Sequence, residues 1–213
     1  TLKDTRTCQQ ARTHCTGASI QNTKNIRTEI HVEKIYRIGH GYDVHRLKSG
    51  RALVLGGVTI PHSEGLDGHS DADVLVHALI DSMIGALALG DIGVFFPDTD
   101  ERYRGISSIE LLARTEEIIS GEGYRISNAD MTIVAQAPKL SLYIPEMRKN
   151  ISRTLGCDTD DISIKATTEE KLGFTGRLEG IRLTAYVCLK KYNLCWQYTA
   201  CSSIFLQMHM TLL

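Results

Sequence analysis

The stretch DVLVHALIDSMIGALAL, residues 73–89, is nearly continuous in Ala, Leu, Val and Ile and determines the fold that we expect. Small residues recur in it at helical spacing: Ala78, Ser82, Gly85 and Ala86. Apolar residues around a whole helix indicate that it is buried, and small residues allow a close neighbour. We therefore predict a buried, closely packed helix, with Ser70 and Asp71 as candidates for its N-terminal cap.

Strand and helix patterns follow one another on both sides of this helix. Residues 35–45 and 52–60 indicate strands, and Gly56-Gly57 predicts a turn or bulge within the second one. Ser107 and Glu110 form a capping-box pattern before a further helix. The other expected elements are the end of that helix at Gly121 or Gly123, a strand over 126–135 stopped by Pro138, a helix over 143–155 closed by Gly156, and strands over 162–166 and 181–189. The fold class is α/β or α+β, a single domain with a sheet of about four strands packed on one side by helices.

The size and charge of the chain limit its function. Its 213 residues fit one compact domain with tails. The net charge of −1 provides no field that would gather polyanions, so we do not expect a nucleic-acid partner. No run approaches the roughly 20 apolar residues of a membrane-spanning helix, so we do not expect a membrane partner either.

The cysteines indicate a reducing compartment. The sequence has six: Cys8, Cys15, Cys157, Cys188, Cys195 and Cys201. They form no CxxC pair, and four lie near the termini, which suggests neither a zinc knuckle nor a disulfide framework. The chain also lacks a glycine-rich Rossmann fingerprint and a P-loop, so any phosphate must be bound in another way.

The two ends differ in composition from the middle of the chain. Residues 1–34 are rich in Thr, Gln, Asn and Arg without an apolar period, which indicates a disordered or extraneous extension. A remnant of an organellar transit peptide is the alternative, because basic and hydroxyl residues outnumber acids early in it. Residues 192–213 abruptly gather Cys, Met and the only Trp, so we interpret them as an atypical tail. The folded domain is expected over residues 35–191.

Three separated residues form a candidate metal site. On a strand, the spacing of Asp43 and His45 points both side chains to one face, where they can bind one ion. His77 lies in an otherwise apolar helix, where an unpaired ring would be costly, so it needs a partner. Three N and O ligands with an open fourth position are typical of catalytic zinc. Alone, each histidine could equally be a hydrogen-bonded structural residue.

Ordered motifs connect these residues to a known family. GHGYDVHR (39–46), GHSDADVLVHALIDS (68–82) and LGDIGVFFPDTD (89–100) are followed by TIVAQAPKL (132–140), IPEMR (144–148) and IKATTEEKLGFTGRLEGI (164–181). Together they resemble the 2-C-methyl-D-erythritol 2,4-cyclodiphosphate synthase family over about residues 36–190. The resemblance implies a homotrimer with active sites between subunits. It also implies conversion of 4-diphosphocytidyl-2-C-methyl-D-erythritol 2-phosphate to the cyclic diphosphate and cytidine monophosphate, in isoprenoid precursor synthesis.

The resemblance also implies cofactors and catalytic residues. Zinc would be held by Asp43, His45 and His77, and magnesium or manganese by Glu170 at the diphosphate. His69 and Thr168 would stabilise the transition state, which suits a phosphoryl transfer that needs charge neutralisation more than covalent help.

The remaining matched positions are expected to bind substrate. The full set is Asp43, His45, His69, Ser70, Asp81, Asp91, Ile92, Gly93, Phe96, Pro97, Asp98, Ala135, Pro138, Lys139, Leu140, Ala166, Thr167, Thr168, Glu170, Phe174 and Arg177. Structural alternatives exist for several of them. Ser70 could be only a helix cap, Thr167 to Glu170 a capping box, and Asp81 a helix-internal partner.

Other functions fit parts of the pattern. A metal-dependent phosphohydrolase would also use an Asp-x-His pair and a distant histidine, and a non-catalytic trimeric relative would keep ligand binding alone. A fused cytidylyltransferase is not expected, because about 34 residues before the core cannot form that domain. The motifs favour a cytoplasmic enzyme, or a plastid one if the first residues are a transit-peptide remnant.

Overall fold

The computed structural model of the chain describes residues 35–191. The expectations for residues 1–34 and 192–213 lie outside the described residues. Within the described part, no helix is long and apolar enough to cross a membrane.

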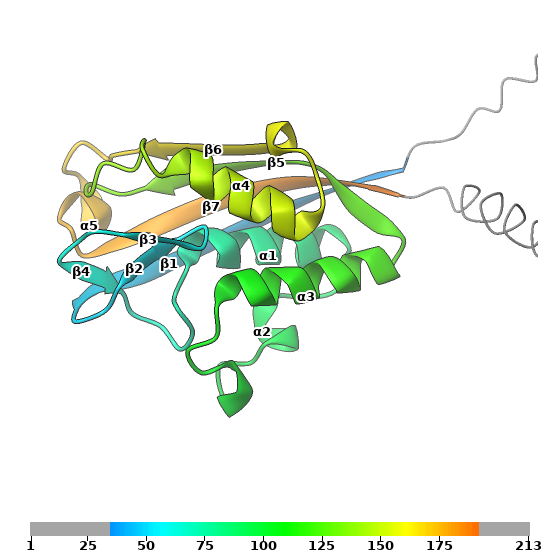
Figure 1. Cartoon of the computed structure of the whole chain (residues 1–213), viewed down its shortest axis with the longest axis horizontal. Helices are drawn as coiled ribbons and strands as arrows, with labels where there is room; N and C mark the ends of the chain where they lie inside the picture. Colours follow the sequence, from blue (N-terminus) through cyan, green and yellow to red (C-terminus); the bar gives the residue numbers. More distant parts are fainter. Residues whose placement is uncertain (1–34, 192–213) are drawn as a thin grey trace, which may run out of the picture. The chain divides into compact units, whose positions relative to one another are not determined.

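A five-stranded sheet organises the domain, in the order β4-β1-β7-β5-β6 (Figure 1). Its strands are β1 (Tyr36–Ser49), β4 (Glu64–Leu66), β5 (Tyr124–Val134), β6 (Ile162–Thr167) and β7 (Gly180–Lys191). Only β5 and β6 run parallel; the other neighbours are antiparallel. The predicted class is confirmed. The additional strand is β4, whose three residues are too few to show a period of two.

A separate two-stranded hairpin replaces the second predicted strand. It consists of β2 (Leu53–Leu55) and β3 (Val58–Ile60), and the turn between them is Gly56-Gly57. Both glycines have positive φ angles, 58° and 69°, which residues with a side chain rarely adopt. The turn that the paired glycines predicted is therefore confirmed.

Three long helices cover one face of the sheet (Figure 1). They are α1 (Val74–Ala86), α3 (Ser108–Gly121) and α4 (Ile144–Leu155). The shorter ones are α2 (Ile92–Phe95), α5 (Gly173–Gly176) and the 3₁₀ turns Glu101–Tyr103 and Thr159–Asp161. The alternating apolar residues of β7 all face these helices and are buried: Ile181, Leu183, Ala185, Val187 and Leu189.

Helix α1 packs directly on the backbone of β1, as its small residues predicted. A Cβ on Gly41 would lie 1.9 Å from the carbonyl oxygen of Ala78, and one on Gly39 would lie 1.8 Å from that of Ser82. No side chain fits between the two backbones at these points. This contact sets the distance between the strand that carries Asp43 and the helix that carries His77.

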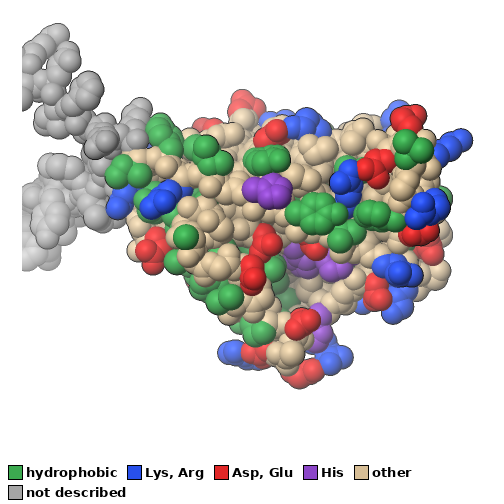
Figure 2. All heavy atoms as spheres, turned by 180° about the vertical axis from the view of Figure 1, so that it is seen from behind, with side chains coloured by type: hydrophobic (Ala, Val, Ile, Leu, Met, Phe, Trp, Pro, Cys, Tyr) green, Lys and Arg blue, Asp and Glu red, His purple; other side chains and the backbone are tan. Residues whose placement is uncertain are grey.

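The opposite face of the sheet is open in the described part of the chain. Large apolar side chains on β1 and β7 are exposed there: Ile38 by 78%, Tyr42 by 45%, Val44 by 43% and Tyr186 by 52%. Figure 2, seen from behind the view of Figure 1, shows green apolar side chains and a histidine among charged residues.

Gly156 closes α4 as predicted, but the N-cap of α1 is a different residue and that of α3 lacks the predicted side-chain bond. Asp73 is the N-cap of α1, and its carboxylate accepts hydrogen bonds from the backbone of Leu75 and Val76, both at 3.2 Å. Ser70 and Asp71 are therefore not its caps. Ser107 precedes α3 but forms no side-chain capping bond. The carboxylate of Asp71 accepts from the Ser108 backbone at 2.9 Å instead, which a local motif could not reveal because the two residues are 37 positions apart.

Asp73 also anchors the hairpin, and replacing it should destabilise the domain. It is fully buried, and its second carboxylate oxygen accepts from the Gly57 backbone at 2.7 Å. Asp73→Ala removes the cap and leaves the Gly57 amide unsatisfied, which should lower the free energy of unfolding by about 2 to 4 kcal/mol in urea titrations. Burial raises the pKa of Asp73 to about 6, because the charged form is disfavoured in the interior. Asp73→Asn keeps one acceptor oxygen but turns its NH2 group toward either the Gly57 amide or the first amides of α1, so it should lose only part of what Asp73→Ala loses. Equal losses would contradict this explanation.

Candidate functional site

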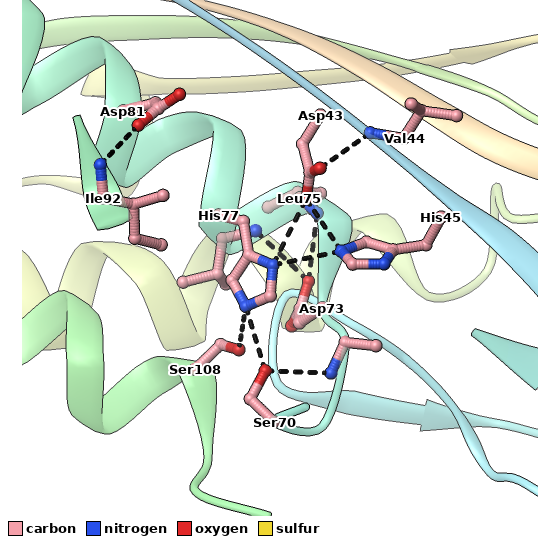
Figure 3. A network of polar contacts seen from close by, with 12 residues as sticks. Asp43, Val44, His45, Ser70, Asp73, Leu75, His77, Asp81, Ile92 and Ser108 are labelled. Carbon is pink, nitrogen blue, oxygen red and sulfur yellow. Dashed lines mark hydrogen bonds and ion pairs between the residues drawn. The ribbon is translucent and has the colours of Figure 1, made fainter. Parts of the chain in front are cut away.

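Asp43, His45 and His77 meet at one point between β1 and α1 (Figure 3). The Asp43 Oδ2 atom lies 3.1 Å from His45 Nε2 and 3.2 Å from His77 Nδ1. The two ring nitrogens are 3.3 Å apart. One carboxylate oxygen and two imidazole nitrogens that converge in this way form a donor set suited to a divalent transition metal.

The His45 ring is oriented so that, when neutral, it presents its Nε2 lone pair to Asp43 and His77. Its Nδ1 atom donates to the carbonyl oxygen of Asp67 at 2.8 Å. Because a carbonyl only accepts, Nδ1 carries the proton and a neutral ring keeps its Nε2 lone pair toward Asp43 and His77.

The negative charge of Asp43 and a positive charge on His45 would stabilise each other. Burial alone would raise the pKa of Asp43, but hydrogen bonds from His45 and His77 hold that pKa well below its ordinary value. Burial would lower the pKa of His45, but Asp43 raises it above the ordinary value. Asp43 is therefore a carboxylate that attracts positive charge, whether from a proton on His45 or from a metal ion.

A hollow of about 460 Å³ opens beside these ligands. It is lined by His45, Gly68, His69, Ser70, His77, Ile92, Gly93, Phe96, Pro97, Asp98, Tyr103 and Leu111. We call it the metal cleft. The Nε2 atom of His69 is buried there without a hydrogen-bond partner among the described residues, which leaves it free for a ligand.

A second hollow, of about 360 Å³, lies where β5 and β6 end. Its lining residues are Ala135, Gln136, Ala137, Pro138, Lys139, Leu140, Ser141, Ile144, Ala166, Thr167 and Thr168. We call it the β5–β6 cleft. It shares no lining residue with the metal cleft.

Comparison with known proteins shows which family has these sequence motifs. The model of the YgbB family matches residues 36–190, which include the candidate metal ligands and the linings of both clefts. The chain belongs to the YgbB family.

Its relatives are named consistently. The chain is 59% identical over 155 residues to the 2-C-methyl-D-erythritol 2,4-cyclodiphosphate synthase of Desulfitobacterium hafniense (strain DSM 10664 / DCB-2), covering 73% of this chain and 98% of that protein. It is 59% identical over 153 residues to the synthase of Clostridioides difficile, covering 72% and 94%. The resemblance that the motifs indicated is therefore confirmed.

Solved structures share the YgbB fold. The bifunctional IspDF of Campylobacter jejuni matches with a TM-score of 0.73 and 42% identity, over 76% of this chain but only 44% of that longer one. A CDP complex of IspF from Plasmodium falciparum matches with a TM-score of 0.66 and 37% identity, over 74% and 97%.

Most residues predicted from the YgbB motifs lie in one of the two clefts. Nine of them line the metal cleft: His45, His69, Ser70, His77, Ile92, Gly93, Phe96, Pro97 and Asp98. Seven line the β5–β6 cleft: Ala135, Pro138, Lys139, Leu140, Ala166, Thr167 and Thr168. Asp43 completes the ligand set, and Phe174 lies in a third groove with Tyr42 and Glu179.

The other predicted residues have structural partners. The carboxylate of Asp81 accepts from the Ile92 backbone at 2.7 Å, and burial raises its pKa. Asp91 caps α2 by accepting from Val94 at 3.1 Å. Both acids therefore place α2, which supplies Ile92 and Gly93 to the metal cleft. Arg177 is exposed and pairs with Glu179 at 2.7 Å.

The capping-box interpretation of Thr167 to Glu170 is wrong. No helix starts there: the next one, α5, begins at Gly173. Glu170 instead has a positive φ of 52° and is exposed, and its Oε1 atom accepts from Thr168 Oγ1 at 2.7 Å. This strained loop holds a carboxylate and a hydroxyl at the mouth of the β5–β6 cleft.

Sequence reasoning missed several residues around the metal cleft. Tyr103 and Leu111 line it, and Asp67, Asp71 and Ser108 hold or surround the histidine ligands. Asp71 lies in the motif at 68–82 but was interpreted only as a candidate cap, and the family motifs do not include the other four. The capping-box pattern of Ser107 and Glu110 marked the start of the helix beside Ser108 but gave no sign of the contact between Ser108 and His77.

Proposed function

We propose that this chain converts 4-diphosphocytidyl-2-C-methyl-D-erythritol 2-phosphate to 2-C-methyl-D-erythritol 2,4-cyclodiphosphate and cytidine monophosphate, a phosphorus–oxygen lyase reaction of isoprenoid precursor synthesis. The observation that carries this proposal is the convergence of Asp43, His45 and His77 at the edge of a cleft, in a chain 59% identical to synthases of that name. In this reaction the 2-phosphate attacks the β-phosphorus, and the bond from that phosphorus to the cytidine phosphate breaks.

Asp43, His45 and His77 would hold a divalent ion, which we assign as zinc. Two imidazoles and one carboxylate with an open position match the ligand sets of catalytic zinc. When bound, such an ion would act as a Lewis acid on a phosphate oxygen. The exposed carboxylate of Glu170 would contribute to a second site, for magnesium or manganese at the diphosphate.

Neighbouring side chains would orient the phosphates. His69 offers a buried Nε2 atom that has no hydrogen-bond partner within residues 35–191, and Ser70 offers a hydroxyl 3.2 Å from His77. Donors fixed before the substrate binds stabilise developing charge without reorganisation. Thr168 would provide the corresponding hydroxyl from the β5–β6 cleft.

The β5–β6 cleft would bind the cytidine diphosphate end of the substrate. It combines apolar walls with backbone polar groups and Lys139, whose charge suits a phosphate. A structural relative, the IspF of Plasmodium falciparum, is described as a CDP complex, which supports a nucleotide here.

The assembly that we propose is a homotrimer with active sites between subunits. The two clefts share no lining residue, so a substrate that needs both could receive one from each subunit. The exposed apolar side chains of β1 and β7 provide a surface for that contact. We place the enzyme in the cytoplasm, with residues 35–191 as its catalytic domain.

Phosphorus NMR tests the proposed reaction directly. The purified protein is incubated with the cytidine diphosphate substrate and magnesium, with and without a zinc chelator. Cyclic diphosphate and cytidine monophosphate that form only without the chelator support the synthase. Linear phosphate products would indicate the phosphohydrolase, and no turnover by a metal-loaded protein would indicate a non-catalytic relative.

Thr168 is expected to affect chemistry and not metal binding. Its hydroxyl contacts Glu170 and lies outside the metal cleft. Thr168→Ala should lower kcat about 100-fold, the typical cost of one lost transition-state donor, while zinc content stays unchanged. Thr168→Ser keeps the hydroxyl and should recover most of the rate. A Thr168→Ala protein that loses zinc as His77→Ala does would refute this separation of roles.

A further inference from the structure

His77 has a second edge, which faces away from Asp43 and His45 (Figure 3). Its Nε2 atom lies 2.8 Å from the Ser108 hydroxyl and 3.2 Å from the Ser70 hydroxyl. Ser108 is fully buried at the start of α3, so its hydroxyl cannot turn to solvent. This edge of the ring therefore connects the proposed ion position to α3.

The direction of these hydrogen bonds follows from Asp71. The Asp71 carboxylate is in close contact with the Ser108 hydroxyl, and it also accepts from the backbone of Ser108 at 2.9 Å and of Asp73 at 3.3 Å. A carboxylate can only accept, so the Ser108 hydroxyl proton points to Asp71. The Ser108 oxygen then faces His77 with a lone pair, and His77 Nε2 must carry the proton.

We propose that Asp71 and Ser108 are positioning residues that fix the His77 tautomer for metal binding. With the proton on Nε2, the Nδ1 lone pair points to Asp43 and His45. A carboxylate behind a histidine ligand makes the ring a stronger donor and fixes its orientation. His45 obtains the same support from a carbonyl, whereas His77 obtains it through a hydroxyl that relays the charge of Asp71.

This arrangement also frees Ser70. Its oxygen accepts from the Ala72 backbone at 3.2 Å, and no hydrogen bond in the described residues requires its proton. Because Ser108 accepts from His77 at the shorter distance, the Ser70 proton remains available to an anion in the metal cleft. The two serines thus have different tasks, although both contact the same nitrogen.

Three variants distinguish the proposed effect of Asp71 and Ser108 on the His77 tautomer from an effect on the stability of α3. Ser108→Ala removes the hydroxyl and keeps the backbone amide that Asp71 caps. Ser107→Ala is the matched control, because the exposed Ser107 lies next to it and forms no side-chain capping bond. Asp71→Asn keeps the size of the side chain, but its amide can donate to Ser108, so the serine proton would turn toward His77 and oppose metal binding.

Zinc affinity, measured on each purified full-length variant by competition with a chromophoric chelator, tests the inference. Ser108→Ala and Asp71→Asn should bind zinc about 10- to 100-fold more weakly than the parent, and Ser107→Ala should match the parent. In ¹⁵N-histidine spectra of the zinc-loaded protein, the His77 Nε2–H resonance should move upfield and exchange faster in Ser108→Ala. A merely structural role for Ser108 would lower the melting temperature without moving this resonance.

The inference rests on the proposed metal site, and the same titration distinguishes the two. If the parent binds no zinc, the metal site itself is refuted and the relay with it. If the parent binds zinc and folded Ser108→Ala binds it equally well, only the relay is refuted. A loss of affinity shared by Ser107→Ala would likewise overturn the relay, since it would reflect the helix start and not the contact to His77.

Discussion

His77→Ala should lose zinc and turnover together. The ring supplies one of three converging ligand atoms, and a small side chain on the buried helix α1 cannot replace it. Without the ion, phosphate charge in the transition state would lose about 4 kcal/mol of stabilisation, roughly a thousandfold in kcat. Metal content measured by elemental analysis and the phosphorus NMR assay check both parts on the same sample.

His62→Ala is the control for this result. His62 lies in the segment between β3 and β4, where its Nδ1 atom is hydrogen-bonded to the Glu64 backbone, and it does not line the metal cleft. It should keep zinc and the parental rate. A His77→Ala protein that retains stoichiometric zinc, or one that turns over at a rate near the parent without it, would refute the assignment of the ligand set.

Gly41→Ala should disrupt both the fold and the site. Its Cβ would lie 1.9 Å from the Ala78 carbonyl oxygen and 2.8 Å from the Ser82 backbone nitrogen. These are backbone atoms, so α1 would have to move away from β1, at an expected cost of about 3 kcal/mol or more in the free energy of unfolding. Because Gly41 and Ala78 are close in sequence to Asp43 and His77, the same shift would separate the ligands.

Gly85→Ala makes the same substitution where it should do no harm. Gly85 lies in α1 and is exposed, and an added Cβ would meet only the His40 carbonyl oxygen, at 3.9 Å. We expect it to raise stability by up to about 1 kcal/mol, since alanine favours a helix. Urea unfolding and zinc titration of both variants compare the two sites. Equal stability of Gly41→Ala and the parent would contradict the close packing of β1 and α1.

Much of this protein was predictable from patterns that are local in the chain. The apolar run with its small residues predicted α1, the alternating residues 181–189 predicted the strand β7, and Gly56-Gly57 predicted a turn. These succeed because side-chain periodicity and glycine geometry act over a few residues. The Asp43-x-His45 pair succeeded for the same reason, since one strand places both side chains on one face.

The family was also determined by the sequence, because its motifs occur in order over residues 36–190. The sequence did not determine the cap of α1 or the conformation of residues 167–170. It also did not determine the hydrogen-bond partners of the histidines. Asp71 reaches Ser108 across 37 positions, and His77 reaches Asp43 across 34. Hydrogen bonds of this kind depend on which two elements pack together in the tertiary structure, and a pattern of a few neighbouring residues does not contain that information. The sequence thus determined which residues are candidate metal ligands, whereas the packing of α1 against β1 and α3 decided which nitrogen of His77 faces Asp43 and His45.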